Sequence, residues 1–191
     1  ASCDRTLCLI QELHKRDPRV QVLTFSRNFG YQPSLLAGIR HARGEAILLI
    51  DVDCEDPPEL LGRFLSLWEQ GYDLVFGIRN RRREWLAIQW ARKLFYRFTH
   101  LIADYEFLID MGDFALFSRR VREVVISNRS TFPFIRTELG FSGFQSIGVP
   151  YQRERRLHGH SHFNPWKMAQ FAWGGMLSST TFFLRLGVYL G

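Results

Sequence analysis

Cysteine, long apolar runs and internal repeats are scarce or missing in this chain of 191 residues. Its three cysteines, Cys3, Cys8 and Cys54, form no CxxC pair, which indicates neither a disulfide framework nor a zinc knuckle and favours a reducing, cytoplasmic setting. The apolar stretch at 176–191 carries Arg185 and is too short to cross a bilayer, which takes about 20 apolar residues. No repeat or low-complexity stretch divides the chain, so we expect one domain with a short appendage at most.

The chain also lacks a signal-peptide pattern, because it opens with Ala1 and no apolar segment follows. Basic residues are in excess: 25 Lys and Arg face 19 Asp and Glu, for a formal net charge of +6. Such a balance favours partners that carry phosphate, or an anionic membrane surface. Nucleic acid would fit the charge alone, but we trace no basic groove interleaved with aromatic residues and expect no nucleic-acid partner.

Predicted strands and helices alternate along much of the chain. We expect strands at 20–25, 46–51, 72–77, 114–117 and 145–153, and helices at 32–43, 57–70, 86–101 and 119–127. Gly44 and Gly71 stand where helix C-caps belong. Strands that alternate with helices of this length predict an α/β fold with a mostly parallel sheet built from βαβ units.

An apolar strand at 47–50 runs directly into a cluster of carboxylates, Asp51, Asp53, Glu55 and Asp56. These side chains repel one another, so a cation or solvent has to neutralise them. Ligands of open α/β sheets gather at the carboxyl ends of strands. We therefore predict that Asp51 and Asp53 bind a divalent metal ion that bridges a phosphate.

The same residues also fit a solvated acidic loop at the start of the next helix. Asp56 would be the N-cap, Pro57 or Pro58 would lie in the first turn, and Glu59 would assist the cap. Metal binding by Asp51 and Asp53 is compatible with this second role for their neighbours.

Residues 164–183 are rich in Trp, Phe and Met, and helical spacing places several of these on one side. One interpretation is a helix that packs on the core. The other is an amphipathic helix at a bilayer surface, with Trp at the headgroups and nearby Lys and Arg beside anionic lipid.

A series of short motifs follows in order along nearly the whole chain. They are SRNFGYQ at 26–32, LAG at 36–38, ARG at 42–44, DVDCEDPPE at 51–59, GIR at 77–79, KLFYR at 93–97, GDF at 112–114, SRR at 118–120 and GVPY at 148–151. The series resembles the family 2 glycosyltransferases that charge polyprenyl phosphates, such as dolichyl-phosphate mannose synthases and bacterial undecaprenyl-phosphate sugar transferases. A lone DxD motif would be weak support, whereas the ordered series is specific.

The resemblance implies a GT-A (Rossmann-like) fold. Residues 1–6 look like the tail of the family's Asp-Asp-Gly-Ser-x-Asp-x-Thr segment, so we expect the first strands and the acidic residues that hold the nucleotide base to lie before residue 1. The expected parts are a catalytic domain at 1–157 and, at 158–191, a basic loop with a juxtamembrane amphipathic segment. His158, His160 and His162 alternate as in a metal cluster, but they fall on that basic loop, which we favour.

The resemblance further implies an inverting, metal-dependent enzyme at the cytoplasmic face of the membrane, anchored through segments beyond residue 191. It would move a sugar from a UDP- or GDP-sugar to undecaprenyl or dolichyl phosphate. Mg²⁺ or Mn²⁺ would bind at Asp51, Asp53 and Glu55, the last of which stands where relatives usually have Gln, and would stabilise the leaving diphosphate. The acceptor phosphate is already ionised near neutral pH, so no strong general base is needed.

Other residues receive expected roles by position. Arg79, Arg92 and Arg97 would bind the acceptor phosphate, since guanidinium groups match phosphate oxygens, although an arginine on a helix face is often simply solvated. Asp113 would act with Asp53 at the reacting centre and orient hydroxyl groups of the sugar or the acceptor.

Two of the assignments have ordinary alternatives. Asp113 could instead cap the helix that starts near Ser118, or pair with an arginine. Arg27 and Asn28 would support the donor site, although Asn28 beside Gly30 also suits a simple turn.

Three hypotheses for the function stay open at this point. The first is sugar transfer to a polyprenyl phosphate, and the second is transfer to another lipid or to a glycan. The third is a non-catalytic subunit that binds a nucleotide-sugar or a lipid phosphate. The sequence names neither the sugar nor the nucleotide, and it leaves a homo-oligomer open.

Overall fold

The computed structural model describes residues 5–53, 55–79, 97, 111–128, 134–152 and 188. Contacts divide the chain into two compact units, Ala1–Ala42 and Arg43–Gly191, and each is described by itself. Several predictions lie outside the described residues: the helix at 86–101 except for Arg97, the basic loop and apolar segment at 158–191 except for Val188, the domain boundary at 157, Arg92 and Cys54.

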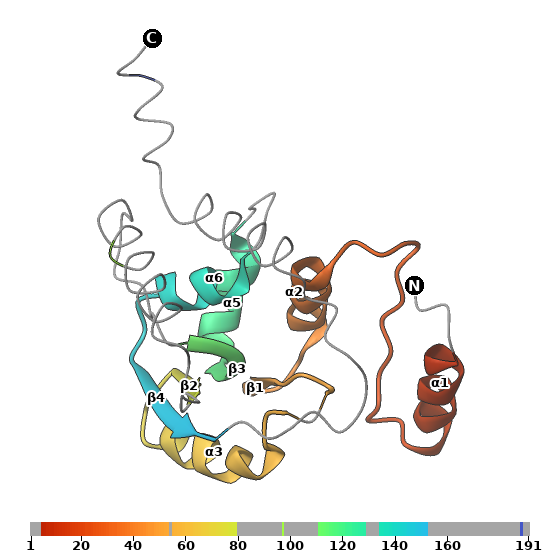
Figure 1. Cartoon of the computed structure of the whole chain (residues 1–191), viewed down its shortest axis with the longest axis horizontal. Helices are drawn as coiled ribbons and strands as arrows, with labels where there is room; N and C mark the ends of the chain where they lie inside the picture. The colour runs from red at the N-terminus through yellow and green to blue at the C-terminus, as the bar shows by residue number, and fades with distance from the viewer. Residues whose placement is uncertain are drawn as a thin grey trace, which may run out of the picture. The chain divides into compact units, whose positions relative to one another are not determined.

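The first unit holds two helices, α1 (Thr6–Arg16) and α2 (Tyr31–His41), drawn in red and orange in Figure 1. Helix α2 confirms the helix predicted at 32–43, whereas α1 was not predicted. The strand predicted at 20–25 is wrong, because these residues form no strand in the structure. Apolar composition favours an extended chain, but a strand also needs a neighbour for its backbone hydrogen bonds, and the described strand pairings include none with this segment.

In the described part of the second unit the strands form a four-stranded sheet. Its strands are β1 (Ala46–Leu49), β2 (Leu74–Arg79), β3 (Met111–Ser118) and β4 (Ser146–Tyr151), in the spatial order β1-β3-β2-β4. Strand β3 is antiparallel to both neighbours, while β2 and β4 are parallel. The α/β fold is confirmed, but the sheet is mixed where we expected a mostly parallel one. A buried apolar strand has the same pattern in either direction, so its sequence does not show which way it runs.

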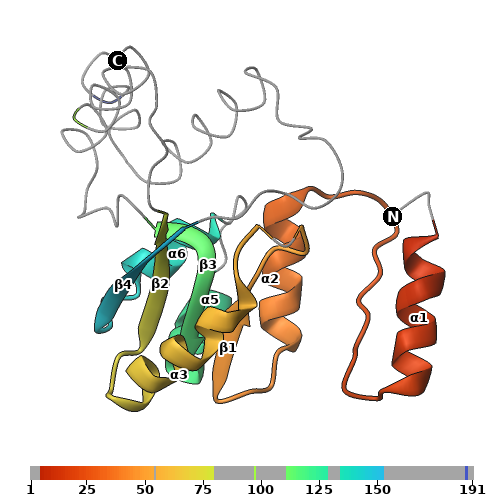
Figure 2. The same cartoon turned by 60° about the horizontal axis from the view of Figure 1, so that its bottom comes forward.

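Helices cover both faces of this sheet. A 3₁₀ turn, η1 (Pro58–Leu60), leads into α3 (Leu61–Glu69) on one face, and α5 (Arg119–Ser127) and α6 (Ile135–Phe141) pack on the other (Figure 2). Among the described residues, no helix is both long enough and apolar enough to cross a membrane.

The core under α3 is made of buried side chains from the helix and from three strands: Phe64, Val75, Phe114, Leu116, Val149 and Tyr151. The rings of Phe64 and Phe114 lie 4.8 Å apart, centre to centre. Burying each such ring contributes roughly 2–3 kcal/mol. Because successive side chains of a strand point to opposite faces, Phe114 and Leu116 facing α3 leave Asp113 on the face that carries α5 and α6.

Two of the predicted helix boundaries can be compared directly. Gly71 follows α3 with a φ of +103°, the left-handed conformation that a glycine C-cap adopts, as predicted. Gly44 is not a cap, because α2 already ends at His41 and Ala42 takes the cap position. Helix α5 has the predicted bounds, and the Ser118 hydroxyl oxygen caps it by accepting a hydrogen bond from the Val121 amide at 3.4 Å.

Candidate functional site

The carboxyl ends of β1, β2 and β4 lie at the same edge of the sheet as the start of β3, because β3 alone runs in the opposite direction. Arg79 and Tyr151 are register partners at this edge. Leu49 of β1 pairs with Ala115 of β3, so Asp51, two residues after Leu49, and Asp113, two residues before Ala115 within β3, lie at the same edge. The strands therefore bring four polar residues that are far apart in the sequence to this edge, with Tyr151 on the face that carries α3 and Asp113 on the face that carries α6.

Asp51, Asp53 and Glu55 form what we call the acidic loop, directly after β1. All three are partly buried, while Val52 between the two aspartates is 98% exposed. The Asp53 Oδ1 atom accepts a hydrogen bond from the Glu55 amide at 3.2 Å, which folds the loop back on itself. The loop thus keeps its carboxylates near the edge of the sheet.

The chemistry of the acidic loop fits a divalent cation. Carboxylate oxygens are the hard ligands that Mg²⁺ and Mn²⁺ prefer. Within the described parts of the chain, no three His, Cys, Asp or Glu side chains are grouped as a metal site. Mg²⁺ is commonly held by one or two carboxylates together with substrate phosphates, and Asp51 and Asp53 suit that arrangement.

Asp56 lies beside this loop and is fully buried. The prediction that it is a helix N-cap is wrong: the 3₁₀ turn begins at Pro58, and the capping position is Pro57. The Asp56 carboxylate instead accepts a hydrogen bond from the hydroxyl group of Tyr151. A guanidinium nitrogen of Arg79, Nη2, lies 3.9 Å from its second oxygen. The local sequence suggested the cap, but the partner comes from a strand 95 residues away.

Arg79 and Tyr151 are also bonded to each other. The Arg79 Nε atom donates to the Tyr151 hydroxyl oxygen at 3.3 Å. Burial, together with the hydrogen bond to Asp56, raises the pKa of Tyr151 to about 12, so its hydroxyl is protonated near neutral pH. Burial acts to lower the pKa of Arg79, but the hydrogen bond to Tyr151 and the negative charge of Asp56 oppose it, and the pKa of Arg79 stays raised. The Arg79 side chain is still 35% exposed, so the predicted phosphate ligand lies at the surface of this edge.

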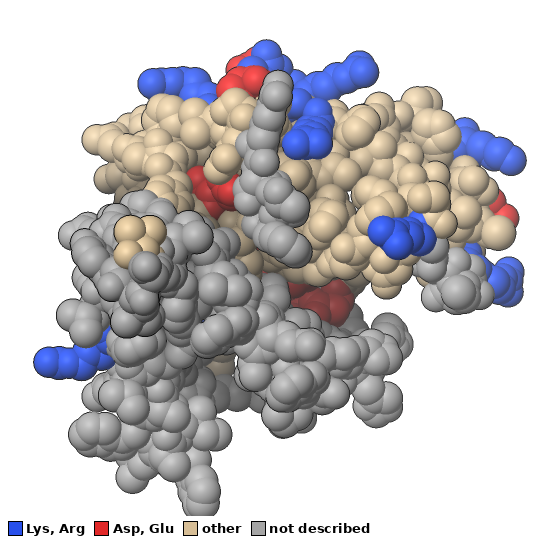
Figure 3. All heavy atoms as spheres, turned by 90° about the horizontal axis from the view of Figure 1, so that it is seen from above, with Lys and Arg blue, Asp and Glu red and all other residues tan. Residues whose placement is uncertain are grey.

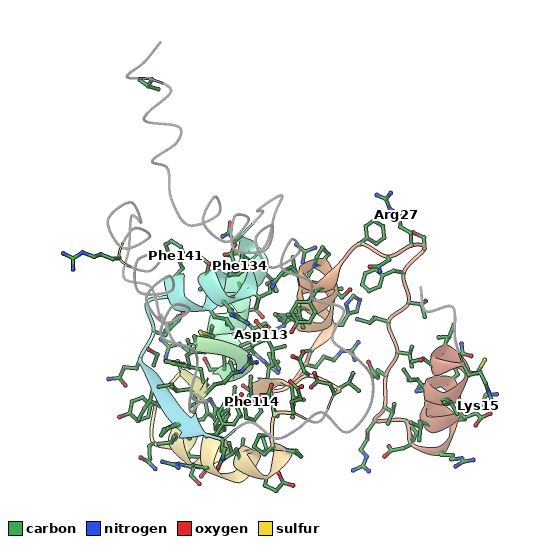
Figure 4. All side chains as sticks on the ribbon, viewed as in Figure 1. Lys15, Arg27, Asp113, Phe114, Phe134 and Phe141 are labelled. Atoms are coloured by element: carbon green, nitrogen blue, oxygen red, sulfur yellow. The ribbon has the colours of Figure 1, made fainter. Side chains whose placement is uncertain are left out.

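Asp113 forms a two-pronged ion pair with Arg136 of α6, in which Nε and Nη2 donate to the two carboxylate oxygens, each at 2.7 Å. Figure 4 shows Asp113 on the α6 side of β3 and Phe114 on the opposite side. Of the two alternatives for Asp113, the pairing with an arginine is confirmed, and the capping role is wrong because Ser118 itself caps α5. Arg136 was missed because α6 was not predicted.

The remaining predicted ligands are spread along the chain. Asn28 accepts a hydrogen bond from the Gly30 amide at 2.8 Å, which confirms the simple turn, and the Arg27 guanidinium lies 4.8 Å from the centre of the Phe29 ring. Both residues are exposed in the first unit (Figure 4 labels Arg27). Arg97 is exposed as well.

Charge at the edge of the sheet is nearly balanced without the acidic loop. The positive charge of Arg136 is close enough to act on Arg79, and Asp56 and Asp113 neutralise the two arginines. The acidic loop then adds a surplus of negative charge that a metal cation would offset. On the face drawn in Figure 3, several of the described Lys and Arg side chains lie near one another along the upper margin, with Asp or Glu beside some of them.

Comparison with known proteins finds relatives that align with all 191 residues of the chain. Residues 1–125 match the family described as Glycosyl transferase family 2. Over all 191 residues the chain is 36% identical to a bactoprenol glucosyl transferase of Shigella phage SfX and covers 63% of that protein. It is also 36% identical to a prophage bactoprenol glucosyl transferase homolog of Escherichia coli (strain K12), of which it covers 62%. The uncharacterized glycosyltransferase YkcC of Bacillus subtilis (strain 168) is 35% identical and 59% covered.

The chain therefore spans about three-fifths of the length of these relatives. The family model covers well over half of the chain, and the motifs from residue 26 to residue 120 lie within or next to the matched range. The family that the motifs resembled is thus confirmed, and this chain belongs to glycosyl transferase family 2.

Proposed function

We propose that this protein transfers a sugar from a nucleotide-sugar to a polyprenyl phosphate. The observation that carries the proposal is the 36% identity, over the whole chain, to proteins named bactoprenol glucosyl transferases. The grouping of carboxylates and arginines at one edge of the sheet supports it, because the reaction needs a site for a diphosphate and for a second phosphate. The donor would be a UDP- or GDP-sugar, and the acceptor undecaprenyl or dolichyl phosphate.

In this proposal Asp51 and Asp53 hold Mg²⁺ or Mn²⁺, and Glu55 adds negative charge beside them. When bound, the ion supplies Lewis-acid stabilisation of the negative charge that grows on the leaving diphosphate. Arg27 and Asn28 are proposed to contact the donor. These assignments rest on the family resemblance and on the carboxylate oxygens that the acidic loop offers to a cation.

Asp113 is proposed to orient a hydroxyl group at the reacting centre. Its ion pair with Arg136 fixes the positions of both carboxylate oxygens. The acceptor phosphate is ionised near neutral pH and attacks without help from a strong base. Asp113 therefore acts by orienting the substrate and not as a base. Arg79, with Arg92 and Arg97, holds the acceptor phosphate in line for an attack that inverts the configuration at the sugar carbon.

The acceptor also sets the place of action. A polyprenyl phosphate carries its phosphate at the surface of a bilayer, so we propose that the protein works at the cytoplasmic face of the membrane. Residues 158–191 would supply the basic loop and the amphipathic segment that meet the lipid.

The proposal is tested in membranes that contain the protein at its full natural length. They receive Mg²⁺ or Mn²⁺, undecaprenyl or dolichyl phosphate, and a panel of UDP- and GDP-sugars, and lipid-linked sugar is measured. Asp51→Asn, Asp53→Asn and Asp113→Asn should each lower the yield at least 100-fold, while Asp17→Asn, at an exposed ion pair with Arg19, should not.

Four results of this assay would count against the proposal or a part of it. Wild-type membranes that make no lipid-linked sugar from any donor would refute it. Product that forms equally well without polyprenyl phosphate would point to another lipid or a glycan as acceptor. Activity unchanged by EDTA would refute the proposed dependence on a metal ion. A product whose anomeric configuration is identical to that of the donor would refute the proposed inversion.

A further inference from the structure

A buried polar network joins Asp56, Tyr151 and Arg79 at the edge of the sheet. We infer that Asp56 and Tyr151 are positioning residues, which orient the Arg79 guanidinium toward a phosphate of the substrates. The inference rests on the proposed function, because it concerns how that site holds phosphate. Neither Asp56 nor Tyr151 was assigned a part in the reaction above.

The Tyr151 hydroxyl group is the centre of the network. It donates its hydrogen to Asp56 and accepts the Nε hydrogen of Arg79 at 3.3 Å. Asp56 attracts the same guanidinium group, since Nη2 lies 3.9 Å from its Oδ2 atom. The orientation of the guanidinium plane is therefore set from one side by two groups that are themselves almost without exposed surface: Asp56 is 0% exposed and Tyr151 is 5% exposed.

Burial of the Asp56 carboxylate costs folding free energy. A buried ionised carboxylate is tolerated only with hydrogen bonds and an opposite charge, and well-packed apolar residues often give equal or greater stability. A network of this kind is thus weak support for stability alone. The network instead has a role at the site, because its partly exposed member, Arg79, lies at the edge that carries the acidic loop.

One glycine makes room for the network, and a second lies beside it. A Cβ atom on Gly77 would lie 2.5 Å from Cε1 of Tyr151, so the ring packs where a side chain would be. A Cβ atom on Gly112 would lie 3.6 Å from Nε and 3.8 Å from Nη2 of Arg79, so the guanidinium lies over bare backbone. The backbone therefore holds the tyrosine ring and the arginine head close to the sheet, and Arg79 is partly exposed there.

A guanidinium group held in this way is prepared for an anion. Its planar set of donors matches phosphate oxygens in a fixed geometry, and a side chain that is already ordered loses less entropy when the ligand binds. The phosphate could belong to the polyprenyl phosphate or to the diphosphate of the donor. A guanidinium group binds either phosphate in the same way, so the KM values of the two substrates are needed to tell which phosphate Arg79 binds.

The test compares Tyr151→Phe with wild type in the lipid-product assay. The substitution keeps the ring and removes the hydroxyl, so Arg79 keeps its charge but loses its orientation. We expect KM to rise about 10-fold for one phosphate substrate, with kcat within about 2-fold. A rise for polyprenyl phosphate assigns Arg79 to the acceptor, and a rise for the nucleotide-sugar assigns it to the donor diphosphate. An unchanged KM for both overturns the inference.

A double-mutant cycle separates positioning from a merely structural role. If Tyr151 acts through Arg79, then Tyr151→Phe should lower kcat/KM by less than about 2-fold when Arg79 is already methionine. An equal loss in both backgrounds would mean that Tyr151 acts on folding alone. Asp56→Asn should behave as Tyr151→Phe does; if it does not fold, the cycle decides without it.

Ser118→Ala is the matched control. Ser118 is 6% exposed and donates a hydrogen bond to Asp73 at 2.6 Å, at the opposite end of β3. It should destabilise the protein by a similar amount and leave both KM values unchanged. If Ser118→Ala raised KM as much as Tyr151→Phe, general destabilisation would explain the effect. An active wild type with an unaffected Tyr151→Phe variant refutes this inference alone, whereas an inactive wild type refutes the proposed function.

Discussion

Replacing Tyr151 with phenylalanine should change how stability depends on pH. The pKa of Tyr151 is about 12 in the folded chain, against an ordinary value of 10.0. The folded state thus binds the hydroxyl proton more tightly than the unfolded state does. The resulting stabilisation is complete below pH 10 and is lost as the pH rises from 10 to 12.

The size of this effect follows from the shift in pKa. Each pKa unit corresponds to about 1.36 kcal/mol, so up to about 3 kcal/mol is at stake, and about half of it is lost at pH 11. Near neutral pH, Tyr151→Phe should lower the free energy of unfolding by about 1–3 kcal/mol, because the buried Asp56 carboxylate loses a hydrogen bond. Above pH 10 the gap between wild type and variant should narrow, since only wild type has this proton to lose.

The assay is urea unfolding of both proteins between pH 8 and pH 11, with tyrosinate absorbance near 295 nm recorded in parallel. The difference in absorbance between the two proteins follows the ionisation of Tyr151 itself. A gap that stayed constant or widened up to pH 11 would refute the reasoning. So would a Tyr151 titration centred near pH 10 in the folded protein.

Three further changes test the packing around the site. Arg136→Met should lower the free energy of unfolding by about 3 kcal/mol, because it leaves the Asp113 carboxylate, only 12% exposed, without its two-pronged partner; a urea midpoint equal to that of wild type would contradict this. Phe64→Ala should cost about 3–5 kcal/mol, since the ring is fully buried, and calorimetry should show the matching fall in Tm. Gly77→Ala should cost about 1–3 kcal/mol by pushing the Tyr151 ring aside and should raise the same KM as Tyr151→Phe; an unaffected KM would show that the ring can move without disturbing Arg79.

Local patterns in the sequence predicted the elements well where the pattern and the contacts agree. The helix at 119–127 was predicted with the bounds that the structure gives α5, because Ser118 supplies a cap and Val121 and Val125 supply the buried face. The acidic end of β1 was recognised because an apolar run stops abruptly at carboxylates. Where a segment pairs with no described strand, as at 20–25, composition predicted a strand that does not form.

The candidate site was predictable in part. Asp51, Arg79 and Asp113 were each singled out, and the structure brings the strands that carry them to one edge. Their partners were not predictable, because nothing local marks them. Asp56 is hydrogen-bonded to Tyr151, which is 95 residues away in the sequence. Asp113 pairs with Arg136 only because α6 packs on the face of β3 toward which Asp113 points.

The reversed direction of β3 has a consequence for how related chains can vary. Strand β2 ends at Arg79 and β3 begins at Met111, whose register partner is Ile78, so these two strand ends lie side by side at the edge where Arg79 meets Asp56. Because the register of the two strands is set by their own pairing, the number of residues between the two ends does not fix it. Related chains can therefore differ in length between these two strand ends and still keep the pairing that places Arg79 beside Asp56.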